Sequence, residues 1–149
     1  MSLQTDVMTA MKTAMKAKDQ NALASLRAIK SAILTAQTES GASEELSEED
    51  EIKMLQKLVK QRKDSAAIYI EQDRAEMAQE ELAQAAVIEQ FLPEQLGEEE
   101  IEKIVTAVIE KAGASGMQDM GKVMGLVSQE LAGKADGKTI STIVRKKLA

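Results

Sequence analysis

The sequence predicts an all-α protein, and three of its properties lead to that fold class. Tyr69 and Phe91 are its only aromatic residues, so a core has to be built from Leu, Ile, Val, Ala and Met. One proline, eight glycines and few clusters of β-branched residues favour helices over strands. Apolar residues recur at steps of three and four, which is the period of an amphipathic helix. We therefore expect an N-terminal antiparallel helical bundle or hairpin domain and a small three-helix C-terminal domain.

The first two helices are predicted from their caps and apolar spacing. Ser2 can cap a helix that runs to about Lys18, and residues 19–21 interrupt it before a second helix over about 22–37. Residues 38–45 then read as a polar loop. The positions expected to be buried are Leu3, Val7, Met11, Ala14 and Met15 in the first helix and Leu26, Ile29, Ile33 and Ala36 in the second.

The third and fourth helices are predicted to complete the N-terminal bundle. Ser47 begins the third with an acidic first turn, and Asp73 can cap the fourth. Arg62 falls near the apolar line, which predicts a partly buried pairing with Glu80 or Glu81. The apolar faces are expected to consist of Ile52, Leu55, Leu58, Val59, Ala66, Tyr69 and Ile70 in the third helix and Ala78, Leu82, Ala85, Ile88 and Leu92 in the fourth.

Pro93, the only proline, is expected to end the N-terminal helices. We place the boundary within residues 91–96, which predicts domains at 1–92 and 93–149. Gly97 would cap the fifth helix, with Leu96 and Ile101 as a hydrophobic staple. That helix is expected to bury Ile101, Ile104, Val105 and Val108 and to end at Gly113.

Two short helices separated by the turn Gly133–Gly137 are predicted to follow. Gly133 stops the first of them, and Asp136 caps the second. The apolar positions are Met117, Met120, Met124, Val127 and Leu131 before the turn and Ile140, Ile143, Val144 and Leu148 after it. A methionine stripe of this kind is read as core rather than as a soft-metal site.

Four glycines of this region are candidates for close approach by another group. Gly121 and Gly125 run along one side of a predicted helix with Ser128 and Ala132, and each glycine costs a helix roughly 0.5–1 kcal/mol relative to alanine. Something is therefore expected to pack close to this side. Gly133 and Gly137 belong either to a simple tight turn or to a site where a partner's backbone approaches and helix-start amides meet a phosphate; the sequence leaves both open.

Charge is segregated along the chain, although the net charge is only −6. An acidic total argues against nonspecific coating of nucleic acid. Residues 53–63 nevertheless carry five bases and no acid, and residues 117–149 carry six bases and three acids. Lys53, Lys57 and Lys60 form either a solvated face or a phosphate-contacting one, with the solvated face favoured.

Several classes of chemistry are disfavoured by what the composition lacks. The chain has no cysteine, hence no disulfide or thiolate, and no histidine, the commonest metal ligand and general base. No nucleophile has a recognisable base, and the acidic run before and within the start of the third helix lacks the spacing of calcium ligands. We expect no catalytic residues, no metal and no cofactor. No apolar run reaches about 18 residues, so we expect no membrane partner and a cytoplasmic protein.

Taken together, several motifs resemble the GatB/YqeY family, specifically its small stand-alone YqeY-like proteins. The resemblance covers nearly the whole chain, and Gly97 departs from it at a position where Ser or Thr is usual. The motifs are Leu92–Leu96, Met117–Met124 and Gly133–Lys138, with Leu26–Ile33, Lys60–Ser65, Tyr69, Arg74, Glu80 and Glu81 in the N-terminal part.

The resemblance implies two helical domains, the second similar to the tail of the B subunit of tRNA-dependent amidotransferases. Those enzymes are carbon–nitrogen ligases with glutamine as amide donor; their tail helps to hold tRNA, and their reaction centres lie elsewhere. The expected function is a tRNA-binding accessory module in translation, which is not expected to catalyse the reaction alone. The alternative is a protein-interaction module attached to an amidotransferase or an aminoacyl-tRNA synthetase. The candidate nucleic-acid contacts are Lys122, Lys134, Lys138, Arg145 and Lys146.

Overall fold

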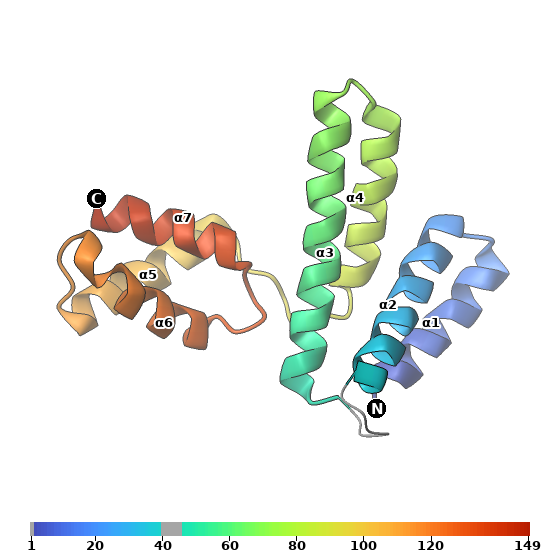
Figure 1. Ribbon diagram of the computed structural model, residues 1–149, viewed down its shortest axis with the longest axis horizontal. Helices are drawn as coiled ribbons and strands as arrows, with labels where there is room; N and C mark the ends of the chain where they lie inside the picture. Colours follow the sequence, from blue (N-terminus) through green and yellow to red (C-terminus); the bar gives the residue numbers. More distant parts are fainter. Residues whose placement is uncertain (1, 40–45) are drawn as a thin grey trace. The chain divides into compact units, whose positions relative to one another are not determined.

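The computed structural model describes residues 2–39 and 46–149, and within them the chain is helical with no strand (Figure 1). The all-α prediction is therefore confirmed. Residues 40–45, most of the predicted polar loop, lie outside the described residues. The helices are α1 (Leu3–Ala17), α2 (Gln20–Glu39), α3 (Glu48–Glu71), α4 (Ala75–Glu89), α5 (Glu98–Ala112), the short 3₁₀ helix η1 (Met117–Asp119), α6 (Met120–Glu130) and α7 (Gly137–Leu148).

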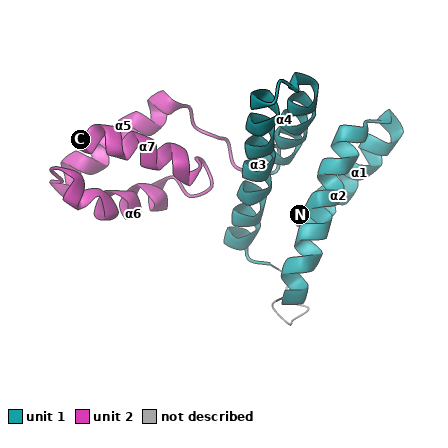
Figure 2. Cartoon of the chain, turned by 45° about the horizontal axis from the view of Figure 1, so that its top comes forward, with its two compact units in different colours: residues 1–92 teal, residues 93–149 magenta. Residues whose placement is uncertain are grey.

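The chain divides into two compact units, which we call unit 1 (residues 1–92) and unit 2 (residues 93–149) (Figure 2). Each unit has its own cluster of buried apolar side chains. Whether the two units also fold as independent domains stays a prediction.

Unit 1 consists of two antiparallel helix pairs, α1–α2 and α3–α4, with α2 packed on α4 (Figure 1). Ser25 lies fully buried at the α2–α4 contact, where its hydroxyl oxygen is 2.9 Å from the Asn21 carbonyl oxygen and 3.3 Å from that of Gln84. These two carbonyl groups accept from the hydroxyl and so satisfy it. Burial of a polar residue such as Ser25 cannot be predicted from the pattern of apolar residues. The buried core residues are Leu3, Val7, Ala14, Leu23, Leu26, Ile29, Ile33, Leu55, Val59, Ala85 and Ile88.

The helix starts of unit 1 follow local capping chemistry. The side chain of Ser2 accepts a hydrogen bond from the Thr5 amide, and that of Ser47 accepts one from the Asp50 amide, as predicted. Asp19 caps α2 through the Ala22 amide, so this helix begins earlier than predicted. Asp73 does not cap α4, because its φ of 60° places it in the left-handed turn before that helix.

The predicted apolar faces of unit 1 are wrong at three positions. Met15, Ile70 and Leu82 are exposed. Toward the far end of the α3–α4 pair the buried residues are small, Ala66 and Ala78, whereas the larger Ile70 and Leu82 beside them are exposed. Helical spacing identifies an apolar face but cannot tell whether another helix covers it.

The predicted pairing of Arg62 with Glu80 or Glu81 is also wrong. Arg62 donates from Nη1 to the Leu58 carbonyl in its own helix at 3.4 Å, and its buried Nε has no partner. An ion pair between α3 and α4 instead joins Lys63 Nζ to Glu89 Oε1 at 2.8 Å. The neighbouring residue on α3 thus takes the role that the sequence suggested for Arg62.

Unit 2 is a three-helix arrangement of α5, α6 and α7 around one core (Figure 2). Leu96 packs against this core, to which Ile101 belongs, while the staple contact between the two stays a prediction; Gly113 ends α5 with a φ of 64°. The buried core residues are Ile101, Val105, Val108, Val123, Val127, Leu131, Ala135, Ile140, Val144 and Leu148.

The methionine stripe that runs from η1 into α6 is only partly buried. Met117 is exposed and Met120 and Met124 are half-buried, whereas Val123, which the stripe omitted, is fully buried. Met117 belongs to η1, whose tighter winding moves it out of the α-helical register.

We predict that unit 2 folds by itself. Limited proteolysis should cut between the end of α4 and the start of α5, and a fragment of residues 93–149 should keep a helical circular dichroism spectrum and melt cooperatively, because its core contacts are internal. Preferred cleavage inside α3, or an unfolded fragment, would show that the compact units are not domains.

Candidate nucleic-acid interface

The turn between α6 and α7 is held in place by the segment that precedes α5. Gln95 Nε2 donates to the Gly133 carbonyl oxygen at 2.7 Å, and the Leu96 amide donates to the Lys134 carbonyl oxygen at 2.9 Å. Gly133 is buried with a φ of 77°, a conformation that favours glycine. The anchoring role of Gln95 was not predicted, because one polar residue in a connecting segment gives no periodic signal.

Asp136 caps α7, as the sequence predicted. Its carboxylate accepts from the Thr139 amide at 2.7 Å and from the Thr139 hydroxyl at 3.0 Å. This interaction supplies a partner for one helix-start amide and places a negative charge there, which disfavours a phosphate at the same point. An anion approaching this region would therefore depend on the lysine and arginine side chains rather than on the helix-start amides.

The five candidate cations are all exposed in unit 2. Lys138 and Arg145 are seven residues, or about two turns, apart, so they share one side of α7. That side is separate from buried Ile140 and Val144. Helix α7 carries four bases and no acid. The exposed candidates are Lys122 on α6, Lys134 in the turn, and Lys138, Arg145 and Lys146 on α7.

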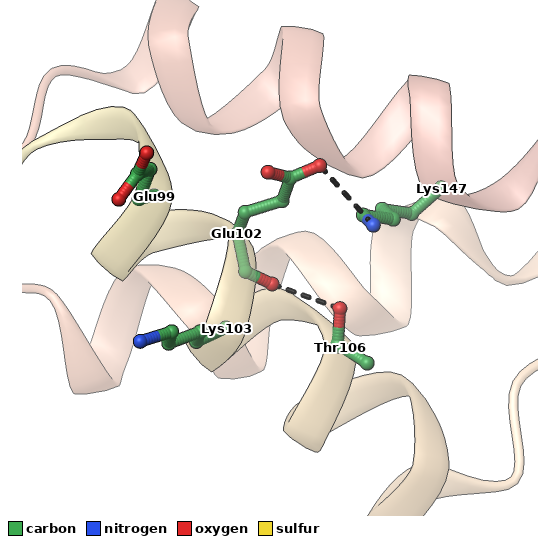
Figure 3. A pocket seen from close by; sticks show the side chains of 5 residues that line it. All are labelled: Glu99, Glu102, Lys103, Thr106 and Lys147. Atoms are coloured by element: carbon green, nitrogen blue, oxygen red, sulfur yellow. Dashed lines mark hydrogen bonds and ion pairs between the residues drawn. The ribbon is translucent and has the colours of Figure 1, made fainter.

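Lys147, the remaining base of α7, has a different role. Its Nζ lies 3.1 Å from Glu102 Oε1 and so joins α7 to α5 (Figure 3). The pair lies in an open hollow of about 420 Å³ lined by Glu99, Glu102, Lys103, Thr106 and Lys147. Its lining mixes two carboxylates with two ammonium groups and leaves neither charge in excess.

The small-residue side of α6 faces outward, away from the core. Gly121, Gly125, Ser128 and Ala132 are all exposed. A Cβ added at Gly121, Gly125 or Gly137 would meet no atom within 4 Å apart from its chain neighbours and the nearby backbone of its own helix. The prediction that something packs closely on this side is therefore not met inside the described chain, and these glycines leave room for a group from outside it.

The basic side of α3 is partly neutralised by neighbouring carboxylates. Lys53 Nζ lies 3.0 Å from Glu49 Oε1, and its hydrogen bond to and attraction by that carboxylate raise the pKa of Lys53. Lys63 is paired with Glu89, which leaves Lys57 and Lys60 exposed. Fewer free cations gather here than on α7 and its preceding turn.

Neither a cluster of metal-ligating side chains nor a membrane-spanning helix is found among the described residues. Within residues 2–39 and 46–149, no three acidic side chains are grouped so that they could hold a metal ion. None of the described helices combines the length and the apolar character needed to cross a membrane.

Comparison with known proteins matched nearly the whole chain. A family model described as "Yqey-like protein" matches residues 4–148. Two curated relatives are both the E subunit of a glutamyl-tRNA(Gln) amidotransferase. That of Thermococcus gammatolerans is 47% identical over 57 residues, and that of Thermococcus sibiricus is 40% identical over 57 residues. Each match covers 36% of this chain and 9% of the relative, so the chain spans about a tenth of the length of these proteins.

We predict that Gly121→Ala and Gly125→Ala each stabilise the protein. Both positions lie within α6 and have open space around them, so the added methyl group removes glycine's helix penalty without a clash. The expected gain is about 0.5–1 kcal/mol per substitution in the free energy of unfolding, measured by denaturant titration. A loss of stability would show that this side of α6 is packed against something in the free protein.

Proposed function

Because this chain belongs to the Yqey-like protein family, we propose that it is a tRNA-binding accessory module whose unit 2 contacts the phosphate backbone. The observation that carries the proposal is the separation of charge from core on α7. Lys138 and Arg145 project on one side of the helix and Ile140 and Val144 are buried on the other, while Lys134 is exposed in the turn. Phosphate contacts of this kind position a protein on RNA without reading its sequence.

The charge distribution of unit 2 would orient the bound RNA. Helix α5 carries five acids and two bases, whereas α7 carries four bases and no acid. RNA would be repelled from α5 and attracted to α7, even though the whole chain is acidic. Lys122 would add a contact from α6, and Lys146 another near the end of α7.

The exposed glycines of α6 support the same proposal. With no side chain at Gly121 and Gly125, a sugar-phosphate chain can come closer to the helix than it could to any other residue. The stability that these glycines cost α6 is not compensated by packing within the described chain. Close contact with an external group would explain why glycine is present at these positions.

The relatives indicate an amidotransferase-related setting. Their name refers to an enzyme that acts on glutamyl-tRNA(Gln), and the matched stretch is about as long as unit 2. The role proposed for this chain is to hold RNA; the carbon–nitrogen ligase reaction, with glutamine as amide donor, would be performed by a partner. The same proposal includes a role of this protein in translation and its location in the cytoplasm.

A protein-interaction module attached to an amidotransferase or an aminoacyl-tRNA synthetase is the second candidate. The observation that favours it is the α5 side of unit 2, where Glu98, Glu99 and Glu100 are exposed in the first turn. A surface of this charge suits a basic protein surface and repels RNA.

The basic side of α7 and its turn can be tested by reversing their charge. Lys134→Glu, Lys138→Glu and Arg145→Glu together should sharply weaken binding to total tRNA and flatten its salt dependence, because each lost phosphate contact removes about one unit from the log–log slope. The melting temperature should barely move, since all three side chains are exposed. Binding is measured by fluorescence anisotropy across a salt series.

The matched control reverses three exposed lysines of unit 1, Lys16→Glu, Lys57→Glu and Lys60→Glu, and so makes the same change in net charge. It should bind more tightly than the first variant. Wild-type protein without salt-dependent affinity for tRNA, or equal losses in the two variants, would remove the RNA proposal. Salt-insensitive capture of an amidotransferase or synthetase subunit would then favour the protein-interaction alternative.

A further inference from the structure

The turn between α6 and α7 lies outside the helices, yet both backbone groups of its exposed lysine are hydrogen-bonded. The Lys134 amide donates to the Leu131 carbonyl oxygen at 2.8 Å, and the Lys134 carbonyl oxygen accepts from the Leu96 amide at 2.9 Å. The residues on either side, Gly133 and Ala135, are buried. The backbone of Lys134 is therefore held between two buried neighbours, while its side chain is exposed.

Gln95 fastens this turn to the segment that precedes α5. Its Nε2 donates to the Gly133 carbonyl oxygen at 2.7 Å and to the Pro93 carbonyl oxygen at 2.8 Å. A glutamine amide has two N–H donors, so both are used, one on each segment. The carboxamide oxygen that remains is an acceptor and does not bind a phosphate. Gln95 can therefore affect a bound phosphate only through the turn that it holds.

We infer that Gln95 is a positioning residue for the RNA contact of Lys134, an inference that rests on the function proposed above. Without the bond from Gln95, the turn would sample more conformations, and RNA would have to order it on binding. Ordering the equivalent of one flexible side chain at an interface lowers affinity about two- to tenfold. Gln95 reduces this cost because the backbone of Lys134 is held before RNA arrives.

Among the proposed phosphate contacts, the effect of Gln95 should be confined to Lys134. Lys138 and Arg145 belong to α7, whose start is capped by Asp136 and whose other side is buried in the core of unit 2. That helix keeps its own hydrogen bonds and core contacts when the bond from Gln95 is removed. The contact made from the turn is thus the one that depends on Gln95.

A double-mutant cycle on the full chain tests this role. Gln95→Met replaces the amide with a side chain of nearly the same length that has no N–H donor, and Lys134→Met removes the ammonium group. Lys134→Met should weaken binding to total tRNA several-fold and take about one unit from the log–log salt slope. Gln95→Met should weaken binding about two- to tenfold, and by no more than Lys134→Met does.

The double variant distinguishes positioning from a general structural role. When Lys134→Met is already present, Gln95→Met should cause no further loss of affinity, because the contact that it positions is gone. The same loss from Gln95→Met with and without Lys134 would show that Gln95 acts through another part of the chain, and would overturn the inference. So would a Gln95→Met variant that binds tRNA as wild type does while Lys134→Met weakens binding.

The matched control is Gln90→Met, the same chemical change at an exposed side chain of unit 1. It should leave tRNA binding unchanged with and without Lys134→Met. Gln95 is itself exposed, so its substitution should lower the melting temperature only slightly. If Gln95→Met does not fold, Gln95→Asn takes its place in the cycle, because it keeps the amide on a shorter side chain that does not reach both carbonyl groups.

A second measurement separates this inference from the proposed function, because it needs no RNA. Hydrogen exchange of the Leu96 and Lys134 amides reports on the two bonds that hold the Lys134 backbone. Gln95→Met should speed the exchange of both amides, and Gln90→Met should not. Unchanged exchange in Gln95→Met would refute the inference whether or not the chain binds tRNA. Faster exchange in a chain whose wild type has no salt-dependent affinity for tRNA would instead remove the proposed function, and the positioning role with it.

Discussion

Two hydrogen bonds fix the turn on which the proposed interface depends. The side chain of Gln95 and the amide of Leu96 bind the carbonyl groups of Gly133 and Lys134, and so tie the start of unit 2 to the turn between its last two helices. The carbonyl group of buried Gly133 needs such a partner. Because the backbone of Lys134 is held, its side chain leaves the turn from a defined point, and Asp136 begins α7 in a defined direction.

Local chemistry explains why much of the fold could be predicted. Ser2, Ser47 and Asp136 cap helices by accepting a hydrogen bond from an amide three residues later. Because donor and acceptor are so close in sequence, these caps can be predicted without knowing the fold. Predictions that depended on a second helix were less successful. The spacing of Ile70 matched an apolar face, but at this end of the α3–α4 pair its side chain is exposed. The ion pair expected from Arg62 is made by its neighbour Lys63 instead, with Glu89. Whether an apolar residue is covered, and which charged residues pair between helices, depends on the lengths of the helices and on how they pack against each other.

The candidate site could be predicted in part for the same reason. The separation of Lys138 and Arg145 from the buried side of α7 follows from helical spacing alone, and these side chains are exposed. The glycines of α6 were correctly placed on another side of the helix, but the space beside them is open rather than filled. The predicted cap by Asp136 is present, and its carboxylate lies where a phosphate would otherwise meet the helix-start amides, which disfavours that interpretation of the Gly133–Gly137 turn.

The outer side of α6 and the basic side of α7 are proposed to form one RNA-binding surface, and this is the central claim to test. The most direct test is an amide chemical-shift titration of the isotope-labelled full chain with unfractionated tRNA. We expect the perturbed amides to cluster at Gly121 to Gly125, in the turn at Lys134 and along α7 near Lys138 and Arg145, and to return to their free positions at high salt. Perturbations that fall mainly on α5 or on unit 1, or no perturbation at low salt, would contradict it.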